Sequence, residues 1–327
     1  MLQGRELILA TKPFAKEIRW KSWFHALSTL LLLIGFLSLS YLEMHWGLRL
    51  FAGIFSGLMM VRFFVIYHDH QHQAILQRSV FANFIFTLFG IYILAPTSIW
   101  KRSHDYHHNH NSKLFSASIG SYPIMTVKKF HEVSPSEKRK YLMARHPITI
   151  FLGYLSMFLF GMCVESFMSN PKKHWDSLLA IILHFTYCTL VIYFLGWLTF
   201  LLAILLPFIV AEMIGAYLFY AQHNFPGVVF RTKEDWTYAG AAMESSSYMK
   251  MNFFWRYVTA NIGYHHIHHM NSRIPFYRLP EVMEKLPEMQ QAKTTSLHFK
   301  DIIRCVKLKC WDPEKNEMVG FTALEKQ

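Results

Sequence analysis

Residues 265–269 read His-His-Ile-His-His, and a stretch with four histidines in five residues indicates a binding site that the fold must form. Two earlier stretches resemble it: residues 104–110 read His-Asp-Tyr-His-His-Asn-His, and residues 68–72 read His-Asp-His-Gln-His. A single histidine, His223, stands in the sequence Ala-Gln-His-Asn. Histidines grouped in this way can share one binding site only if their side chains face the same way.

Helix geometry divides the grouped histidines into two sets. Successive residues of an α-helix are rotated by about 100°, so positions three or four apart share a face. The histidines that share a face are His68, His72, His104, His107, His108, His265, His268 and His269. The histidines that point away are His70, His110 and His266, and we expect them to be solvated or to support the others.

The residue type indicates a metal centre. Neutral imidazole binds iron, copper, zinc or nickel, and eight ligands with His223 as a ninth exceed what one metal can hold. Two metals are therefore expected, and two irons together can bind and activate dioxygen. The soluble di-iron bundles use paired Glu-x-x-His motifs instead. Asp69, Asp105 and Asn261 are candidates to hold the outer imidazole nitrogens by hydrogen bonds.

Long apolar runs lie beside these stretches. They cover about residues 23–42, 46–67, 80–99, 148–168, 178–197 and 198–220. Lys and Arg concentrate in residues 5–21, 101–145, 172–173 and 231–309, which the positive-inside rule places in the cytoplasm. Four runs then form two membrane hairpins, the second with its turn around Gly196. The runs at 80–99, which Pro96 breaks, and 148–168 start and end on one side, so we expect interfacial or re-entrant helices.

The predicted fold is thus an all-α integral membrane protein with four transmembrane helices in two hairpins and two interfacial or re-entrant helices. A cytoplasmic helical cap, residues 68–147 and 221–327, holds the di-iron site. Residues 1–327 are expected to form a single domain in the cell (inner) membrane, multi-pass, with both termini cytoplasmic. The first apolar run, 23–42, is long enough to cross a bilayer, so no cleavable signal peptide is predicted.

Composition and charge agree with this interpretation. The chain is 53% hydrophobic, which exceeds the apolar content of an ordinary soluble domain. Its formal net charge is +12. The basic residues lie between apolar runs, which indicates a membrane surface and no nucleic-acid partner. The four cysteines lack metal-ligand spacing and suit a reducing compartment.

The three histidine stretches, in order, spacing and position relative to the apolar runs, resemble those of the membrane fatty acid desaturases. Residues 220–280 are especially similar to bacterial acyl-lipid desaturases, including the delta-12 or omega-6 type. The resemblance covers about residues 45–285. It implies a di-iron site, a reductant protein and a kinked tunnel for the acyl chain. The ligands it implies are His68, His72, His104, His107, His108, His223, His265, His268 and His269.

Two features favour the acyl-lipid branch over the acyl-CoA branch. Three residues separate His68 from His72, where the acyl-CoA branch usually has four. Phe219 stands where that branch has an Asn before the lone histidine. Because no fused haem motif is visible, electrons are expected from a separate acidic donor, a ferredoxin or cytochrome type of protein. The basic cytoplasmic face would attract it.

The predicted reaction is oxygen-dependent desaturation of a fatty acyl chain, more readily lipid-linked than CoA-linked. The alternatives are a membrane hydroxylase with the same metal site, acting on a fatty acid, alkane, sterol or carotenoid, and a non-catalytic metal-binding membrane protein. Arg62 is expected to extend to the membrane interface. Glu212 is expected to be a buried, hydrogen-bonded acid, with a polar contact to substrate as the alternative. Histidines expected to be structural are His25, His45, His131, His146, His174, His184 and His298.

Overall fold

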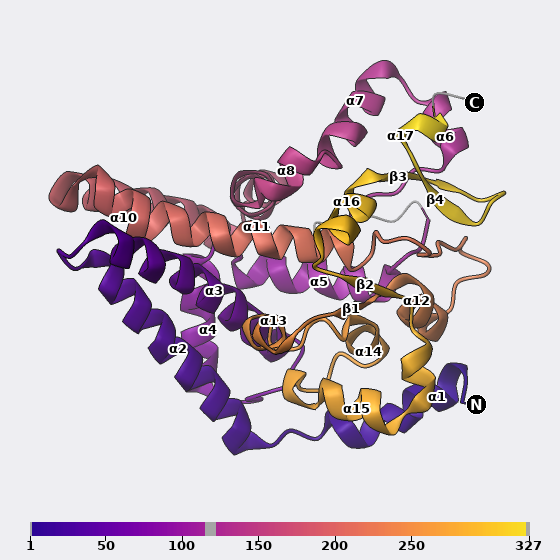
Figure 1. Cartoon of the computed structure of the whole chain (residues 1–327), viewed down its shortest axis with the longest axis horizontal. Coiled ribbons are helices and arrows are strands. Elements are labelled where there is room, and N and C mark those ends of the chain that lie inside the picture. Colours follow the sequence, from indigo (N-terminus) through magenta and orange to yellow (C-terminus); the bar gives the residue numbers. More distant parts are fainter. Residues whose placement is uncertain (1, 115–121, 325–327) are drawn as a thin grey trace.

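The computed structural model describes residues 2–114 and 122–324, which are mostly helical (Figure 1). The helices of the first half are α1 (Gly4–Thr11), η1 (Lys12–Ala15), α2 (Arg19–Tyr41), α3 (Trp46–Gln71), α4 (Val80–Tyr92), α5 (Thr97–His110), α6 (Val127–Glu132), α7 (Pro135–Ala144), α8 (Pro147–Phe151), η2 (Tyr154–Glu165) and α9 (Ser166–Ser169). In Figure 1 the long helices α2, α3 and α10 extend to the left, whereas both termini lie on the right.

The second half begins with α10 (Trp175–Phe200), η3 (Leu201–Leu205) and α11 (Leu206–Ala221). The remaining elements are α12 (Tyr238–Ser245), β1 (Tyr248–Lys250), α13 (Phe253–Val258), α14 (His265–Met270), η4 (Phe276–Arg278), α15 (Leu279–Lys285), η5 (Pro287–Gln291), β2 (Thr294–Ser296), α16 (Phe299–Lys307), β3 (Leu308–Asp312), β4 (Glu317–Gly320) and α17 (Phe321–Leu324).

The cap contains strands, so the all-α prediction is wrong there. Strands β1 and β2 pair in parallel, and β3 and β4 pair antiparallel. These strands have three to five residues each. Runs this short carry little period-two signal, because alternation needs four to eight residues to be recognised.

Among the described residues, three helical segments are long and apolar enough to cross a membrane: Arg19–Tyr41, Trp46–Gln71 and Trp175–Ala221. A fourth candidate exists if α4 and α5, which are bent by 91°, are counted as one span. The run 80–99 is broken as predicted: α4 ends at Tyr92, and Pro96 is the N-cap of α5. A proline fixes its own φ and disfavours helix at the preceding residue, which explains the break.

The segment Trp175–Ala221 reverses direction at Gly196, where the turn was predicted. Gly196 has φ +79° and ψ 170°, which interrupts the helix. The rings of His184 and Phe208 lie only 4.9 Å apart. At a 1.5 Å rise per residue, 24 residues of straight helix would separate them by about 36 Å. The two arms correspond to the predicted runs 178–197 and 198–220.

Two glycines allow α3 to pack closely against the arm that ends in α11. A Cβ at Gly53 would lie 2.3 Å from the carbonyl oxygen of Leu202, and one at Gly57 would lie 2.7 Å from Cβ of Val210. Small residues four apart are the usual means by which membrane helices approach each other. This contact holds α3 and α11 together; His68 lies near the cap end of α3, and His223 follows the cap end of α11.

Candidate metal centre

The structure gathers nine histidines into two groups in the cap. The first group contains His68, His72, His104, His108 and His268, and the second contains His107, His223, His265 and His269. Within each group one ring nitrogen per residue lies within 4.8 Å of the others. These are the nine residues predicted as ligands. Their division was not predicted, because α5 and α14 each contribute to both groups.

The first group is built from α3, α5 and α14. His68 lies in the last turn of the long α3, and His72 is the C-cap residue directly after the helix. The Nε2 atoms of His68 and His104 are 2.8 Å apart, and those of His104 and His108 are 3.1 Å apart. The Nε2 atom of His268 lies 3.0 Å from that of His108 and closes the group.

The second group is built from α5, α14 and the turn after α11. The Nε2 atom of His223 lies 3.0 Å from that of His107 and 2.8 Å from that of His265. His265 and His269 are one helical turn apart, with Nε2 atoms 3.1 Å from each other. The two groups adjoin, since the rings of His108 and His269 stack at 4.2 Å.

These distances fit nitrogen atoms around a common metal ion. Imidazole nitrogens bind such metals at about 2.1 Å, so neighbours at right angles lie about 3.0 Å apart. His223, His265 and His269 are also in the form that binds metal. Burial lowers the pKa of His223 to about 4, and burial with the neighbouring imidazoles lowers the pKa of His265 and His269 far below the usual value. They are therefore neutral at physiological pH.

The outer nitrogens are held differently from the prediction. Asp69 contacts Nδ1 of His68 at 3.2 Å and accepts a hydrogen bond from the Phe276 amide at 2.7 Å, as expected for a supporting acid. Asp105 instead pairs with Lys101 on the exposed side of α5. Asn261 donates to the Phe276 carbonyl, so neither residue supports a histidine in the described structure. His223 is oriented by the Ser245 carbonyl at 2.9 Å, which no sequence pattern indicated.

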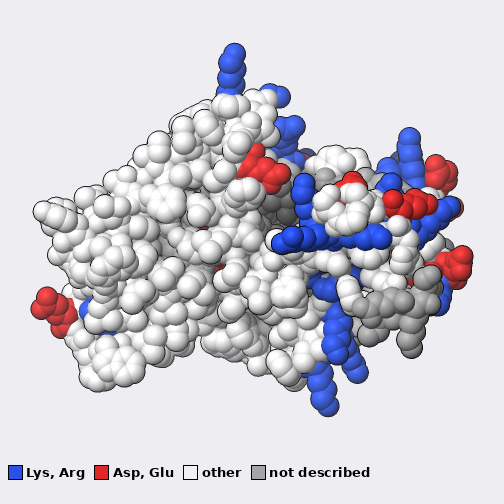
Figure 2. All heavy atoms as spheres, turned by 90° about the horizontal axis from the view of Figure 1, so that it is seen from above, with Lys and Arg blue, Asp and Glu red and all other residues white. Residues whose placement is uncertain are grey.

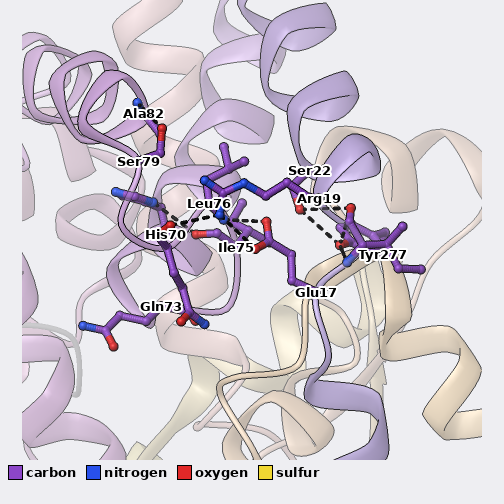
Figure 3. A network of polar contacts seen from close by, with 12 residues as sticks. Glu17, Arg19, Ser22, His70, Gln73, Ile75, Leu76, Ser79, Ala82 and Tyr277 are labelled. Atoms are coloured by element: carbon purple, nitrogen blue, oxygen red, sulfur yellow. Dashed lines mark hydrogen bonds and ion pairs between the residues drawn. The ribbon is translucent and has the colours of Figure 1, made fainter.

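The three histidines predicted to point away lie outside both groups. Nδ1 of His70 lies 3.2 Å from the Ile75 carbonyl (Figure 3). The ring of His70 packs against Phe86. The ring of His110 stacks on Tyr106, and His266 is fully buried beside Tyr248. The isolated histidines are also outside the groups; His45 and His146, for example, accept hydrogen bonds from backbone amides at helix starts.

An apolar cavity leads from the metal centre into the helices. Its lining includes His68, His104 and His265 at one end and Glu212 at the other. Between them the wall is one face of α11, formed by residues 211, 212, 215, 218, 219 and 222. Ten residues of helix span about 15 Å, so the cavity suits an extended chain of methylenes. Phe64 and Phe158 line it as well, with the aliphatic residues Val61, Val65, Ile93 and Ile262, and none of the described lining residues is methionine.

Two residues inside the helices differ from their predictions. Arg62 is 3% exposed and donates hydrogen bonds to the Tyr257 carbonyl and Thr29, so it joins α3 to the cap and does not extend to an interface. Glu212 is 1% exposed, and both carboxyl oxygens lack a hydrogen-bond partner among the described residues. The prediction of a hydrogen-bonded acid is therefore wrong.

Comparison with known proteins agrees with this geometry. The profile of the family described as "Fatty acid desaturase" matches residues 44–300. A "Fatty acid desaturase" of Bacillus subtilis (strain 168) is 29% identical over 327 residues, covering 98% of this chain and 92% of the relative.

More distant relatives have desaturase names as well. An "sn-1 acyl-lipid omega-3 desaturase (ferredoxin)" of Nostoc sp. is 26% identical, covering 78% of this chain and 72% of the relative. An "Omega-6 fatty acid desaturase, chloroplastic" of Spinacia oleracea is 23% identical, covering 74% of this chain and 54% of the relative.

The chain belongs to the fatty acid desaturase family, and the match covers most of its length. It is a membrane oxidoreductase that desaturates fatty acyl chains, with histidine groups able to hold metal. The predicted family and enzyme class are thereby confirmed. The hydroxylase alternative is not favoured, and a non-catalytic metal-binding protein does not agree with the family.

Proposed function

We propose that the enzyme desaturates lipid-linked acyl chains at a di-iron centre, with one iron held by each histidine group. The observation that carries the proposal is the apolar cavity, which ends on His68, His104 and His265 and therefore presents a chain to the metal centre. A ligand set of imidazole nitrogens without carboxylates suits iron, whereas magnesium and calcium bind to oxygen ligands.

When bound, the two irons supply the activation of dioxygen that removes two hydrogens from neighbouring methylenes. The protein's part is positional. The cavity wall of α11 and the rings of Phe64 and Phe158 hold the chain in place and exclude water. Asp69, which the Phe276 amide holds by a hydrogen bond, orients the ring of His68. The Ser245 carbonyl orients the ring of His223. The nine grouped histidines all serve as ligands, so none of them acts as a general base.

The proposed carrier and electron donor rest on the relatives and on charge. The Nostoc relative has both "acyl-lipid" and "ferredoxin" in its name. In Figure 2 the Lys and Arg side chains gather toward one end of the molecule, and the opposite part of the face is nearly free of them. An acidic donor of the ferredoxin or cytochrome type would be steered to that basic end.

The same distribution supports the proposed topology. Four crossings, formed by α2, α3 and the two arms of Trp175–Ala221, would place Gly196 outside and both termini in the cytoplasm. Helix α4 and the helical residues 147–169 would lie at the membrane interface or re-enter the membrane. The whole chain would form one domain in the inner membrane. The basic cap would then face the cytoplasm, as the positive-inside rule requires.

Expression in a host whose lipids lack the product tests the proposal. Iron-replete, aerated cells with a working ferredoxin and reductase should accumulate a new unsaturated acyl chain in their membrane lipids. Purified protein should contain two irons per chain. A hydroxylated chain without a double bond would contradict the reaction, and one iron per chain would contradict the di-iron assignment.

A further inference from the structure

A second cavity adjoins the acyl cavity at Phe219. Phe219 lines both, and the second cavity also reaches His223 of the metal centre. Its walls are polar: they include Arg145, Lys113 and Asn224. None of its described lining residues is Asp or Glu. A molecule that filled both cavities would therefore pass the metal centre with an apolar part on one side and a polar part on the other.

Arg145 is the unusual residue of this cavity. It is 0% exposed, and its guanidinium donates to the Pro123 carbonyl at 3.1 Å, to the Tyr220 hydroxyl at 3.3 Å and to the Asn224 amide oxygen. All three acceptors are neutral, and within residues 2–114 and 122–324 no carboxylate pairs with Arg145. Its Nε atom has no partner among the same residues.

The positive charge around Arg145 is reinforced rather than neutralised. Nζ of Lys309 donates to the Arg145 carbonyl at 2.6 Å, and burial followed by the charge of Arg145 lowers the pKa of Lys309 to about 8. The ring of Tyr220 lies 5.1 Å from the Arg145 guanidinium and offers a partial compensation. A buried cation without an anionic partner is costly, so native proteins pair such charges.

We propose that this cavity is an anion site, in which Arg145 binds the phosphate of the lipid that carries the acyl chain. The inference rests on the proposed function, because it assumes that an acyl chain occupies the apolar cavity. Arginine suits a phosphate because its planar fork donates two parallel hydrogen bonds. The substrate class is then a glycerophospholipid and not a neutral glycolipid.

The test compares carriers with the same acyl chain. Iron-loaded enzyme, with donor and reductase, receives dipalmitoyl phosphatidylglycerol, the corresponding diglucosyl lipid, or palmitoyl-CoA in mixed micelles. The phospholipid should half-saturate the enzyme at a concentration about tenfold or more below that of the glycolipid, as expected for charged hydrogen bonds. Equal values would overturn the proposal. A lower value for palmitoyl-CoA than for the phospholipid would overturn the lipid as the source of the phosphate.

Two variants and one control locate the effect. Arg145→Gln removes the cation, and Ser112→Asp places a carboxylate in the cavity wall without removing any bond that Arg145 makes. Ser112 has φ +58°, which Asp tolerates. Both variants should bring the two lipids to equal half-saturation while iron content is kept. Arg139→Gln removes the same charge from the exposed part of α7 and should leave the preference unchanged. A preference that survives in Ser112→Asp would overturn the assignment.

A binding measurement separates this proposal from the reaction. sn-Glycerol 3-phosphate, compared with glycerol, should raise the thermal midpoint of the detergent-purified wild type but not that of Ser112→Asp. If no lipid gains a double bond but the midpoint still rises, the anion site stands and the proposed function fails. If double bonds form on both lipids equally and the midpoint does not rise, the function stands and the anion site fails.

Discussion

At the scale of single residues, a comparison of His70 with His72 tests which histidines belong to the metal centre. They lie two positions apart, but only His72 belongs to a histidine group, while His70 contacts the Ile75 carbonyl. We expect His72→Ala to abolish turnover and lower the iron content. His70→Ala should keep its iron and lose at most about 10- to 100-fold in activity, as for a residue that supports ligands.

The measurement is iron per purified chain, together with product formed, at equal expression of both variants. A His70→Ala enzyme that loses iron as completely as His72→Ala would contradict the grouping. His110→Ala, which changes a histidine that stacks on Tyr106 outside both groups, serves as a second control.

His266 provides a prediction about pH. It is fully buried outside both groups, and burial lowers its pKa from 6.5 to about 4. Between pH 6.5 and 4 the unfolded chain binds a proton that the folded chain does not, so the free energy of unfolding falls as pH falls through this window. The full shift corresponds to about 3 kcal/mol.

His266→Phe should remove this contribution, since phenylalanine does not titrate and can pack against Tyr248. Thermal midpoints of metal-free protein in detergent, measured from pH 7 to pH 4, should therefore fall less steeply in the variant than in the wild type. Parallel curves for the two proteins would contradict the prediction.

At the scale of elements, the contact between α3 and α11 holds the two halves of the site in register. A methyl group at Gly57 would meet Val210 and the Pro207 carbonyl at less than 3 Å, whereas one at Gly35 in α2 would meet nothing within 4 Å. Gly57→Ala should thus destabilise the protein by about 1–3 kcal/mol, as overpacking does. Gly35→Ala should be neutral or slightly stabilising. Unfolding midpoints and iron content of the two variants provide the check; equal midpoints would contradict the close packing.

Helix α11 also sets the depth of the acyl cavity. A Cβ at Gly215 would lie 3.5 Å from the Phe158 ring, an ordinary contact, so Gly215→Ala should retain activity. A larger side chain at the same position would extend into the cavity between Glu212 and the metal centre. We expect Gly215→Leu to accept only shorter acyl chains, which a competition among acyl lengths would measure. An unchanged preference would mean that the chain does not run along α11.

At the scale of the whole molecule, the Lys and Arg side chains gather toward one end (Figure 2). The excess of 33 Lys and Arg over 21 Asp and Glu gives the +12 charge. If an acidic donor docks on the basic end, turnover at subsaturating donor should fall as salt rises, since screening shortens the reach of steering. Turnover at saturating donor is the control and should change little. A donor-limited rate that is independent of salt would contradict electrostatic docking.

The sequence by itself determined the residues that can gather and the helices that carry them. His223 stands alone in the sequence, and the family resemblance implied its role. The other eight histidines, the exclusion of His70 and His266, and the reversal at Gly196 follow from local rules: helical periodicity, hydrophobic length and backbone conformation. These rules depend on neighbours within a few residues. They are therefore visible in one dimension, and the structure places the corresponding residues as they predict.

Only the tertiary structure decided how these parts meet. His107 is separated from His104 and His108 because α3 brings His68 beside His104, whereas the turn after α11 brings His223 beside His107. Asp105 and Asn261 find other partners, Arg62 reaches the cap, and Glu212 faces a cavity without a partner, since each outcome depends on what a distant segment presents. Burial and hydrogen-bond partners across long sequence separations are set by helix packing, which periodicity within one segment does not encode.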